Sequence, residues 1–214
     1  TPERLIHYTD HAPIGASNGT AIFIHGRRPR ASGWSNFTHN VSAFQEARYR
    51  CIVYDQWGHG KTSKPQDLDH TLDFFVDGLV SLMDSADVAN AVLVGNSLGG
   101  AVALGLALRH PERVEKLILM APGGIESRED YFSMPGIQAM VKYPMGSPEF
   151  TKEVLAQLLT QLVYDPVNVD DELVDERWAT LETQNAHVLA TMQIPDLSDQ
   201  LASIDINTLV FWGT

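Results

Sequence analysis

Residues Ala91–Ala107, AVLVGNSLGGAVALGLA, decide the fold of this chain. Ala91–Val94 is a short apolar run typical of a buried parallel strand, and apolar residues return at helical spacing from Leu98 onward. Between the two lies a G-x-S-x-G sequence, Gly95–Gly99. A turn this tight strains its central residue, and flanking glycines remove side chains that would collide with the following helix. We therefore predict that Ser97 is exposed at the carboxyl end of a sheet, beside a helix N-terminus that favours negative charge.

The motif alone carries little weight, because a G-x-S-x-G sequence occurs by chance in roughly one chain of this length in ten. The strand before it and the helix after it are the context that a nucleophile elbow requires. The alternative is an ordinary glycine-rich turn between a strand and a helix. We interpret Ser97 as the catalytic nucleophile.

Composition sets the class of protein. The chain has 214 residues, 44% of them hydrophobic and 20% charged, which is typical of a globular domain. Its net charge of −12 argues against a nucleic-acid or anionic-membrane partner. No apolar run reaches the roughly 18 residues that a membrane span needs, and we recognise no signal peptide. Cys51 is the only cysteine, so a reducing compartment suffices, and we expect a cytoplasmic location.

Strand-like and helix-like segments alternate along the first part of the chain. Besides the elbow, we expect strands at Leu5–Thr9, Thr20–His25, Cys51–Asp55, Lys116–Ala121 and Ile206–Trp212, and helices at Ser35–Ala47 and Thr71–Ser85. This alternation predicts an α/β fold with a mostly parallel sheet and helices on both faces.

The alternation stops after residue 124. Residues 125–203 contain helical stretches at Phe150–Val163 and Asp171–Thr183 but no clear strand. We predict that 125–203 is a helical cap above Ser97, inserted between a first core part, 1–124, and a last core strand in 204–214. The chain opens on Thr1 and closes just after an apolar run, so we expect both ends to be cuts, with the remainder of the core absent.

These segments resemble the α/β-hydrolase fold and, within it, the carbon–carbon hydrolases that cleave meta-ring-fission products of aromatic degradation. The resemblance covers nearly the whole chain and rests on Gly95–Gly100, Ala31–Phe37, Leu119–Gly124, Leu173–Trp178 and Phe211–Gly213. The Gly-Asn-Ser form of the elbow, together with Gly-Trp-Ser-Asn-Phe, separates this family from generic esterases. Haloalkane dehalogenases and epoxide hydrolases of the same fold place an aspartate where Ser97 stands, so the sequence favours them less.

By this resemblance, the backbone N–H groups of Leu98 and Arg27 form an oxyanion hole, and Gly26 belongs to the substrate site. Backbone amides can hold a developing negative charge without reorganisation. The family usually carries a glycine-rich loop here, whereas this chain reads RRPR at Arg27–Arg30. Two interpretations stay open, a genuine solvated basic loop and a local sequencing error, and resequencing the clone separates them.

The resemblance also assigns three side chains to the substrate. Asn36 and Asn96 would hold the dienoate end, the alternative being that each is a turn or capping residue. Arg177 matches the cap arginine that pairs with the substrate carboxylate, a task that suits a bidentate guanidinium. The alternative for Arg177 is an ion pair along its own helix. The positions three and four residues away hold no acidic residue: Leu173, Val174, Thr180 and Leu181.

A serine nucleophile also needs a base. The candidates are His7, His11, His25, His39, His59, His70, His110 and His187. None of them follows the last strand, where the family places its acid and then its histidine. We expect His25 to brace its loop, His187 to lie in the cap and Asp55 to be a turn residue. By resemblance the acid and the histidine would follow Thr214, so residues 1–214 alone are expected to be poorly soluble and inactive.

The sequence thus predicts a hydrolase that needs no metal or organic cofactor. The resemblance implies that it cleaves the C5–C6 bond of a small anionic 2-hydroxy-6-oxo-hexa-2,4-dienoate, with Ser97 or a water beside it attacking the C6 carbonyl. Alternatives are a carboxylesterase, lactonase or peptidase of the same fold, and a non-catalytic binding protein. We expect no nucleic-acid or membrane partner and leave a homo-oligomer open.

Overall fold

A computed structural model describes residues 4–27, 32–143, 147–179 and 186–213 of the chain. Within these residues, a six-stranded sheet has the order β1-β3-β2-β4-β5-β6. Its strands are β1 Tyr8–His11, β2 Gly19–Ile24, β3 Tyr49–Tyr54, β4 Ala91–Asn96, β5 Val114–Met120 and β6 Thr208–Phe211. β1 runs antiparallel to β3, and every other neighbouring pair is parallel. The predicted mostly parallel sheet is confirmed.

The central strands are buried on both faces, which explains their continuous apolar sequences. Residues Ala21–Ile24 of β2 are fully buried. Because side chains alternate along a strand, Ile22 and Ile24 join one hydrophobic cluster while Ala21 and Phe23 join a second. The sheet therefore separates two cores.

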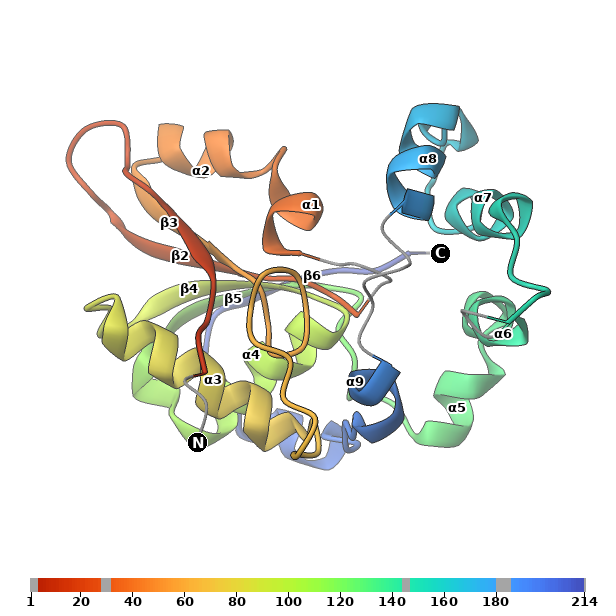
Figure 1. The fold of residues 1–214 in the computed structure, drawn as a ribbon. Coiled ribbons are helices and arrows are strands. Elements are labelled where there is room, and N and C mark those ends of the chain that lie inside the picture. The colour runs from red at the N-terminus through yellow and green to blue at the C-terminus, as the bar shows by residue number, and fades with distance from the viewer. Residues whose placement is uncertain (1–3, 28–31, 144–146, 180–185, 214) are drawn as a thin grey trace. The chain divides into compact units, whose positions relative to one another are not determined.

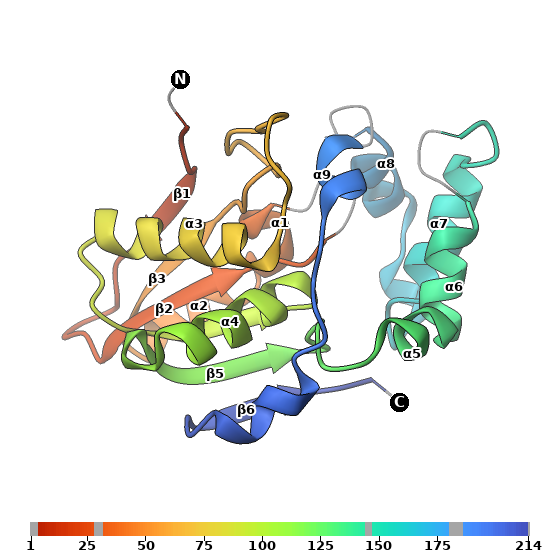
Figure 2. The same ribbon diagram turned by 90° about the horizontal axis from the view of Figure 1, so that it is seen from below.

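Helices cover both faces, as predicted (Figure 1). On one face lie α3, Leu72–Ser85, and α4, Leu98–Arg109, whose apolar residues pack with Ile22 and Ile24. Figure 2 shows these two helices running along the strands. On the other face lie α1, Gly33–Phe37, and α2, Val41–Glu46, which pack with Phe23.

Two predicted segments differ from the structure. The segment Ser35–Ala47 is two short helices, α1 and α2, rather than one. The outer strand begins at Tyr8 rather than Leu5, because the backbone N–H and carbonyl of Leu5 bond to Ser63 in a loop instead of to a strand.

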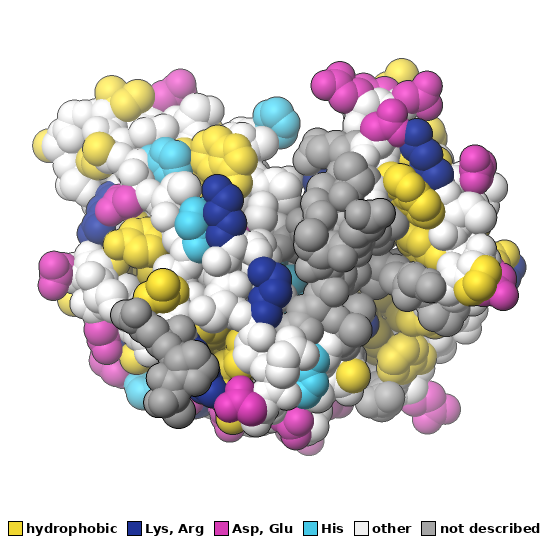
Figure 3. Space-filling model, viewed as in Figure 1, with side chains coloured by type: hydrophobic (Ala, Val, Ile, Leu, Met, Phe, Trp, Pro, Cys, Tyr) yellow, Lys and Arg dark blue, Asp and Glu magenta, His cyan; other side chains and the backbone are white. Residues whose placement is uncertain are grey.

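The chain divides into two compact units, Thr1–Ile125 with Asn185–Thr214, and Glu126–Gln184. The described part of the second unit is helical: α5 Arg128–Ser133, α6 Pro135–Lys142, α7 Lys152–Thr160, η2 Pro166–Asn168 and α8 Asp171–Ala179. Acidic side chains gather over α8, whose first turn holds Asp171 and Glu172 (Figure 3). No helix in the described ranges is long and apolar enough to span a bilayer.

The predicted cap, residues 125–203, extends past the second unit. The helices α9, Ala186–Thr191, and η4, Ser198–Ser203, belong to the first unit with the sheet. The reason is backbone pairing, since Gln193 exchanges hydrogen bonds with His70 and Leu72, and the Leu197 N–H donates to the Gly124 carbonyl at 2.7 Å. His187, which we expected in the cap, therefore lies in the first unit.

β6 forms one edge of the sheet and is exposed along its length. Leu209, Val210 and Phe211 are each exposed by slightly more than half, although successive residues of a strand point to opposite faces. In the described structure, β6 pairs only with β5.

Candidate active site

The turn between β4 and α4 holds Ser97 in a strained backbone conformation. Its φ of 50° and ψ of −115° are rare for a residue with a side chain. Three contacts fix this geometry: the Ser97 N–H donates to the Met120 carbonyl at 3.0 Å, and the Ser97 carbonyl accepts from Gly100 and Gly123, each at 2.9 Å. The predicted strand–turn–helix elbow is present, and its strain is held by neighbouring backbone.

The glycines of the motif are required by close backbone approach. A β-carbon at Gly95 would lie 2.5 Å from the Gly99 carbonyl oxygen. A β-carbon at Gly99 would collide with the carbonyl oxygen of Ile24, at the end of β2. The N-terminus of α4 can therefore sit against the end of β2 only with glycine at position 99.

Helix α4 begins without a side-chain cap, since Ser97 occupies the N-cap position and its hydroxyl accepts no bond from the helix. The first N–H groups of a helix have no partner within the helix and attract negative charge. Leu98 is the first residue of α4, directly after Ser97. This position suits the predicted role of the Leu98 N–H as a donor to an oxyanion.

Gly26, Asn36 and Asn96 lie together beside Ser97. A β-carbon at Gly26 would lie 2.7 Å from Asn96 Oδ1 and 3.2 Å from the Ser97 Cβ, so only glycine allows this approach. The Gly26 N–H donates to Asn36 Oδ1 at 3.2 Å. The four residues come from three segments: Gly26 from the loop after β2, Asn36 from α1, and Asn96 with Ser97 from the end of β4 and the elbow. All four were candidates from the sequence.

The two asparagines have unequal partners. Asn96 Nδ2 donates to the Met120 carbonyl at 3.3 Å, whereas the buried Asn96 Oδ1 has no hydrogen-bond partner among the described residues. A buried polar atom without a partner is costly, and a bound donor would satisfy it. Asn36 braces the Gly26 loop through its oxygen, so the turn-residue alternative accounts for part of its role.

The two arginines that were predicted to serve the site, Arg27 and Arg177, differ in how far they are buried. Arg27 follows Gly26 and is exposed, while Arg28–Arg30 lie outside the described residues. Arg177 is partly buried on α8 in the second unit. Its neighbour Trp178 stacks on Phe150, with ring centroids 6.3 Å apart. The donor role of the Arg27 N–H and the carboxylate-binding role of Arg177 stay predictions.

His25 is fully buried and uses both ring nitrogens. Nδ1 lies 2.9 Å from the Gly26 carbonyl, to which it donates, because Nε2 accepts the Gln56 N–H at 3.0 Å. Burial lowers the pKa of His25, and the neutral ring fits both bonds. The prediction that His25 braces the loop is confirmed.

The neighbouring histidines are also engaged elsewhere. His59 bonds the Trp57 carbonyl, and burial followed by the nearby His25 lowers its pKa to about 3. His70 bonds Thr191, and His187 bonds the Leu68 carbonyl. Among the residues that the structure describes, no hydrogen bond joins the Ser97 hydroxyl to a histidine. The prediction of a base and an acid beyond Thr214 stays a prediction.

Other reactive groups of the described chain fit this chemistry less well. Cys51 is buried on β3, and burial raises the pKa of its thiol to about 11, so little thiolate forms at neutral pH. No group of three or more histidine, cysteine or acidic side chains in the described ranges is arranged to hold a metal ion.

Comparison with known proteins supports a single family. A model of the alpha/beta hydrolase fold matches residues 22–172. The chain is 35% identical to a 2-hydroxy-6-oxo-6-phenylhexa-2,4-dienoate hydrolase of Comamonas testosteroni, over 98% of this chain and 74% of that protein. It is also 35% identical to a 2-hydroxy-6-oxononadienedioate/2-hydroxy-6-oxononatrienedioate hydrolase of the same species, over 98% of this chain and 75% of that protein.

A solved structure of similar architecture is the meta-cleavage product hydrolase from Pseudomonas fluorescens IP01, a serine-to-alanine variant complexed with acetates. It superposes with a TM-score of 0.81 at 26% identity, covering 98% of this chain and 76% of that one.

Proposed function

This chain belongs to the α/β-hydrolase family and, within it, to the meta-cleavage product hydrolases, and we propose that it hydrolyses the C5–C6 bond of a 2-hydroxy-6-oxo-hexa-2,4-dienoate. One water is consumed, and the products are 2-hydroxypenta-2,4-dienoate and the carboxylic acid that carries the C6 substituent. The relatives that act on such dienoates are about a third identical to this chain over nearly all of its length.

The observation that carries the proposal is the cluster of Gly26, Asn36 and Asn96 around the strained Ser97. Generic ester hydrolysis needs the elbow and two backbone donors. The two amide side chains beside the elbow add polar groups that can hold the enol and carboxylate end of a dienoate, and Asn96 Oδ1 lacks a partner in the described chain.

The reaction begins when the C2 hydroxyl of the dienol gives up its proton while C5 gains one, which makes C2 a ketone. Ser97 Oγ, or a water held beside it, then attacks the C6 carbonyl. The C6 oxygen takes up negative charge, which the N–H groups of Leu98 and Arg27 would stabilise. The C5–C6 bond breaks as the C6 carbonyl re-forms, and its electron pair passes to the C2 oxygen. That oxygen takes up the proton that the attacking hydroxyl or water gave up, and the dienol leaves. In the serine route a water then hydrolyses the acyl-serine ester.

Arg177 supplies the counter-charge in this proposal. The substrate carboxylate must bind to a protein with a net charge of −12, so a guanidinium in the site offsets general repulsion. The partly buried setting of Arg177 fits a side chain that keeps its charge near an anion.

The test is turnover by the natural gene product that contains these 214 residues. The dienoate, whose extended conjugation absorbs strongly, is followed by absorbance, and both products are identified by mass. Rapid-quench intact mass shows whether an acyl group accumulates on Ser97, which separates the serine route from the water route. Faster cleavage of p-nitrophenyl esters than of any dienoate would instead favour an esterase.

A further inference from the structure

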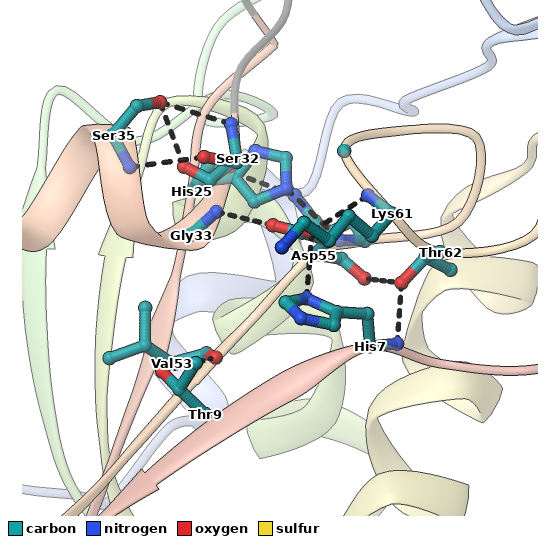
Figure 4. Close-up of polar contacts among 12 residues, drawn as sticks. His7, Thr9, His25, Ser32, Gly33, Ser35, Val53, Asp55, Lys61 and Thr62 are labelled. Carbon is teal, nitrogen blue, oxygen red and sulfur yellow. Dashed lines mark hydrogen bonds and ion pairs between the residues drawn. The ribbon is translucent and has the colours of Figure 1, made fainter.

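The carboxylate of Asp55 lies in a network that the reaction above does not use. Asp55 follows β3 directly, and its side chain is 5% exposed. Figure 4 shows it between two backbone donors, one from the start of α1 and one from the loop after β3. Oδ1 accepts the Gly33 N–H at 2.8 Å, and Oδ2 accepts the Lys61 N–H at 2.9 Å. A buried carboxylate needs such donors, so each of these bonds is costly to lose.

The same carboxylate also binds the N-terminal segment. His7 Nδ1 lies 3.1 Å from Asp55 Oδ2, with the imidazole partly exposed. The His7 carbonyl accepts the Asp55 N–H at 3.0 Å, and Thr62 links the two backbones through its hydroxyl. Gly60 leaves the space for this arrangement, because a β-carbon there would collide with the carboxylate.

From Asp55, one route leads through α1 to the elbow. Gly33 is the first residue of α1, and its missing side chain lets the helix rest against the end of β3. The same helix carries Asn36, whose Oδ1 accepts the Gly26 N–H. The bond from the Gly33 N–H to Asp55 thus holds α1 in place. Through Asn36, α1 in turn holds Gly26, the residue beside Ser97.

A second route leads through the next residue. The Gln56 N–H donates to His25 Nε2, and its side-chain Nε2 donates to the His25 carbonyl at 2.6 Å. His25 directly precedes Gly26. The segment that begins at Asp55 therefore holds the Gly26 loop from both sides, through His25 and through Asn36.

We propose that Asp55 is a positioning residue for the reaction at Ser97: its carboxylate fixes α1 and the 55–63 loop so that Gly26 and the Arg27 N–H face the elbow. This inference rests on the proposed function. Asp55 itself does not touch the substrate. Donors for an oxyanion act only when held in place, so small displacements lower the rate of the chemical step rather than substrate binding.

The test compares Asp55→Asn and Asp55→Ala in the natural gene product, with Asp84→Asn as the matched control. Asp84 is exposed, pairs with Arg113 at 2.8 Å and loses the same charge. Asparagine keeps an oxygen for the Gly33 N–H, but its NH₂ group opposes the Lys61 N–H. We expect kcat to fall about tenfold in Asp55→Asn and about a hundredfold in Asp55→Ala, with KM changed less than about threefold. Asp84→Asn should match the wild type.

A double-mutant cycle separates positioning from general loss of stability. If Asp55 acts through α1 and Asn36, the losses of Asp55→Asn and Asn36→Ala overlap, and the double variant has a kcat within about threefold of the worse single variant. The proposal would be overturned if the kcat loss of the double variant equalled the product of the two single losses. An unchanged kcat in Asp55→Ala would also overturn it.

A second readout keeps this test independent of the substrate. The rate at which a fluorophosphonate labels Ser97, followed by intact mass, should fall in the same order across the variants. If the wild type is labelled but cleaves no dienoate, the proposed function fails while the role of Asp55 is still decided by labelling. If Ser97 of the wild type reacts with neither, both proposals fail.

Discussion

Asn36 Oδ1 accepts the backbone N–H of Gly26 at 3.2 Å, and this bond ties helix α1 to the residue that lies against Ser97. The bond spans ten residues of sequence and joins two segments of the chain. It occupies the oxygen of the Asn36 amide, so a substrate would meet the NH₂ group.

Asn36→Asp tests whether the oxygen of Asn36 holds Gly26 while its NH₂ group meets the substrate. Aspartate keeps an oxygen for the Gly26 N–H but loses the donor and adds a negative charge near an anionic substrate. We expect kcat/KM for the dienoate to fall at least about tenfold, with a neutral p-nitrophenyl ester much less affected. Steady-state kinetics on both substrates measure the difference. Equal losses would mean that Asn36 only braces the loop.

Gly99→Ala should be strongly destabilising, because its β-carbon would collide with the Ile24 carbonyl oxygen where α4 meets β2. Overpacking of this kind costs about 1–3 kcal/mol of unfolding free energy. The control is Gly136→Ala in α6, where a β-carbon would meet no atom within 4 Å, and the expected change is a slight stabilisation. Urea denaturation measures both. A stability of Gly99→Ala within error of the wild type would contradict the geometry.

The elbow could be predicted from sequence because its requirements are local. A strained Ser97 between a strand and a helix needs small residues at Gly95 and Gly99, and both are in the motif. The strands β2 and β4 could be predicted for a similar reason, since burial on both faces leaves an uninterrupted apolar run.

Other features depend on contacts that periodicity does not encode. Phe37, Val41 and Phe44 have helical spacing and share one core, yet the chain turns between α1 and α2. The pattern reports which residues are buried but not whether the helix is continuous. The bond from Gly33 to Asp55 joins residues 22 positions apart, so the network behind Gly26 could not be predicted. The assignment of α9 and η4 to the first unit likewise depends on the backbone pairing of Gln193 with His70 and Leu72.

Arg177→Gln should weaken turnover of carboxylate substrates by about 2–4 kcal/mol in kcat/KM, a typical loss for a charged partner in a desolvated site. A neutral ester should be little affected. Arg109→Gln is the control, because it removes the same charge from a surface cluster with Asp73 and Asp77. Equal losses on the two substrates would assign Arg177 a structural role.

Acid should destabilise the fold through His59. Burial lowers its folded pKa to about 3, whereas the unfolded chain titrates near 6.5. Above the unfolded value the ring is neutral in both states. Below it, only the unfolded chain binds the proton, so the unfolding free energy falls by about 1.4 kcal/mol per pH unit until the folded pKa is reached. His25 and His70, whose pKa values burial also lowers, act in the same direction.

Denaturation at several pH values between about 7 and 5 tests this, with His59→Gln as the comparison. Glutamine can still donate to the Trp57 carbonyl but does not titrate. The unfolding free energy of His59→Gln should depend less steeply on pH than that of the wild type, because unfolding of the variant takes up about one proton fewer. Parallel pH profiles would contradict the assignment.

The most direct measurement is turnover of a 2-hydroxy-6-oxo-hexa-2,4-dienoate by the natural gene product and by its Ser97→Ala variant. The variant lacks one hydroxyl, so circular dichroism should show an unchanged fold. We expect the wild type to release 2-hydroxypenta-2,4-dienoate and a carboxylic acid in equal amounts, and the variant to lose at least about a thousandfold in kcat. A folded variant that keeps more than about a tenth of the wild-type turnover would contradict the assignment of Ser97.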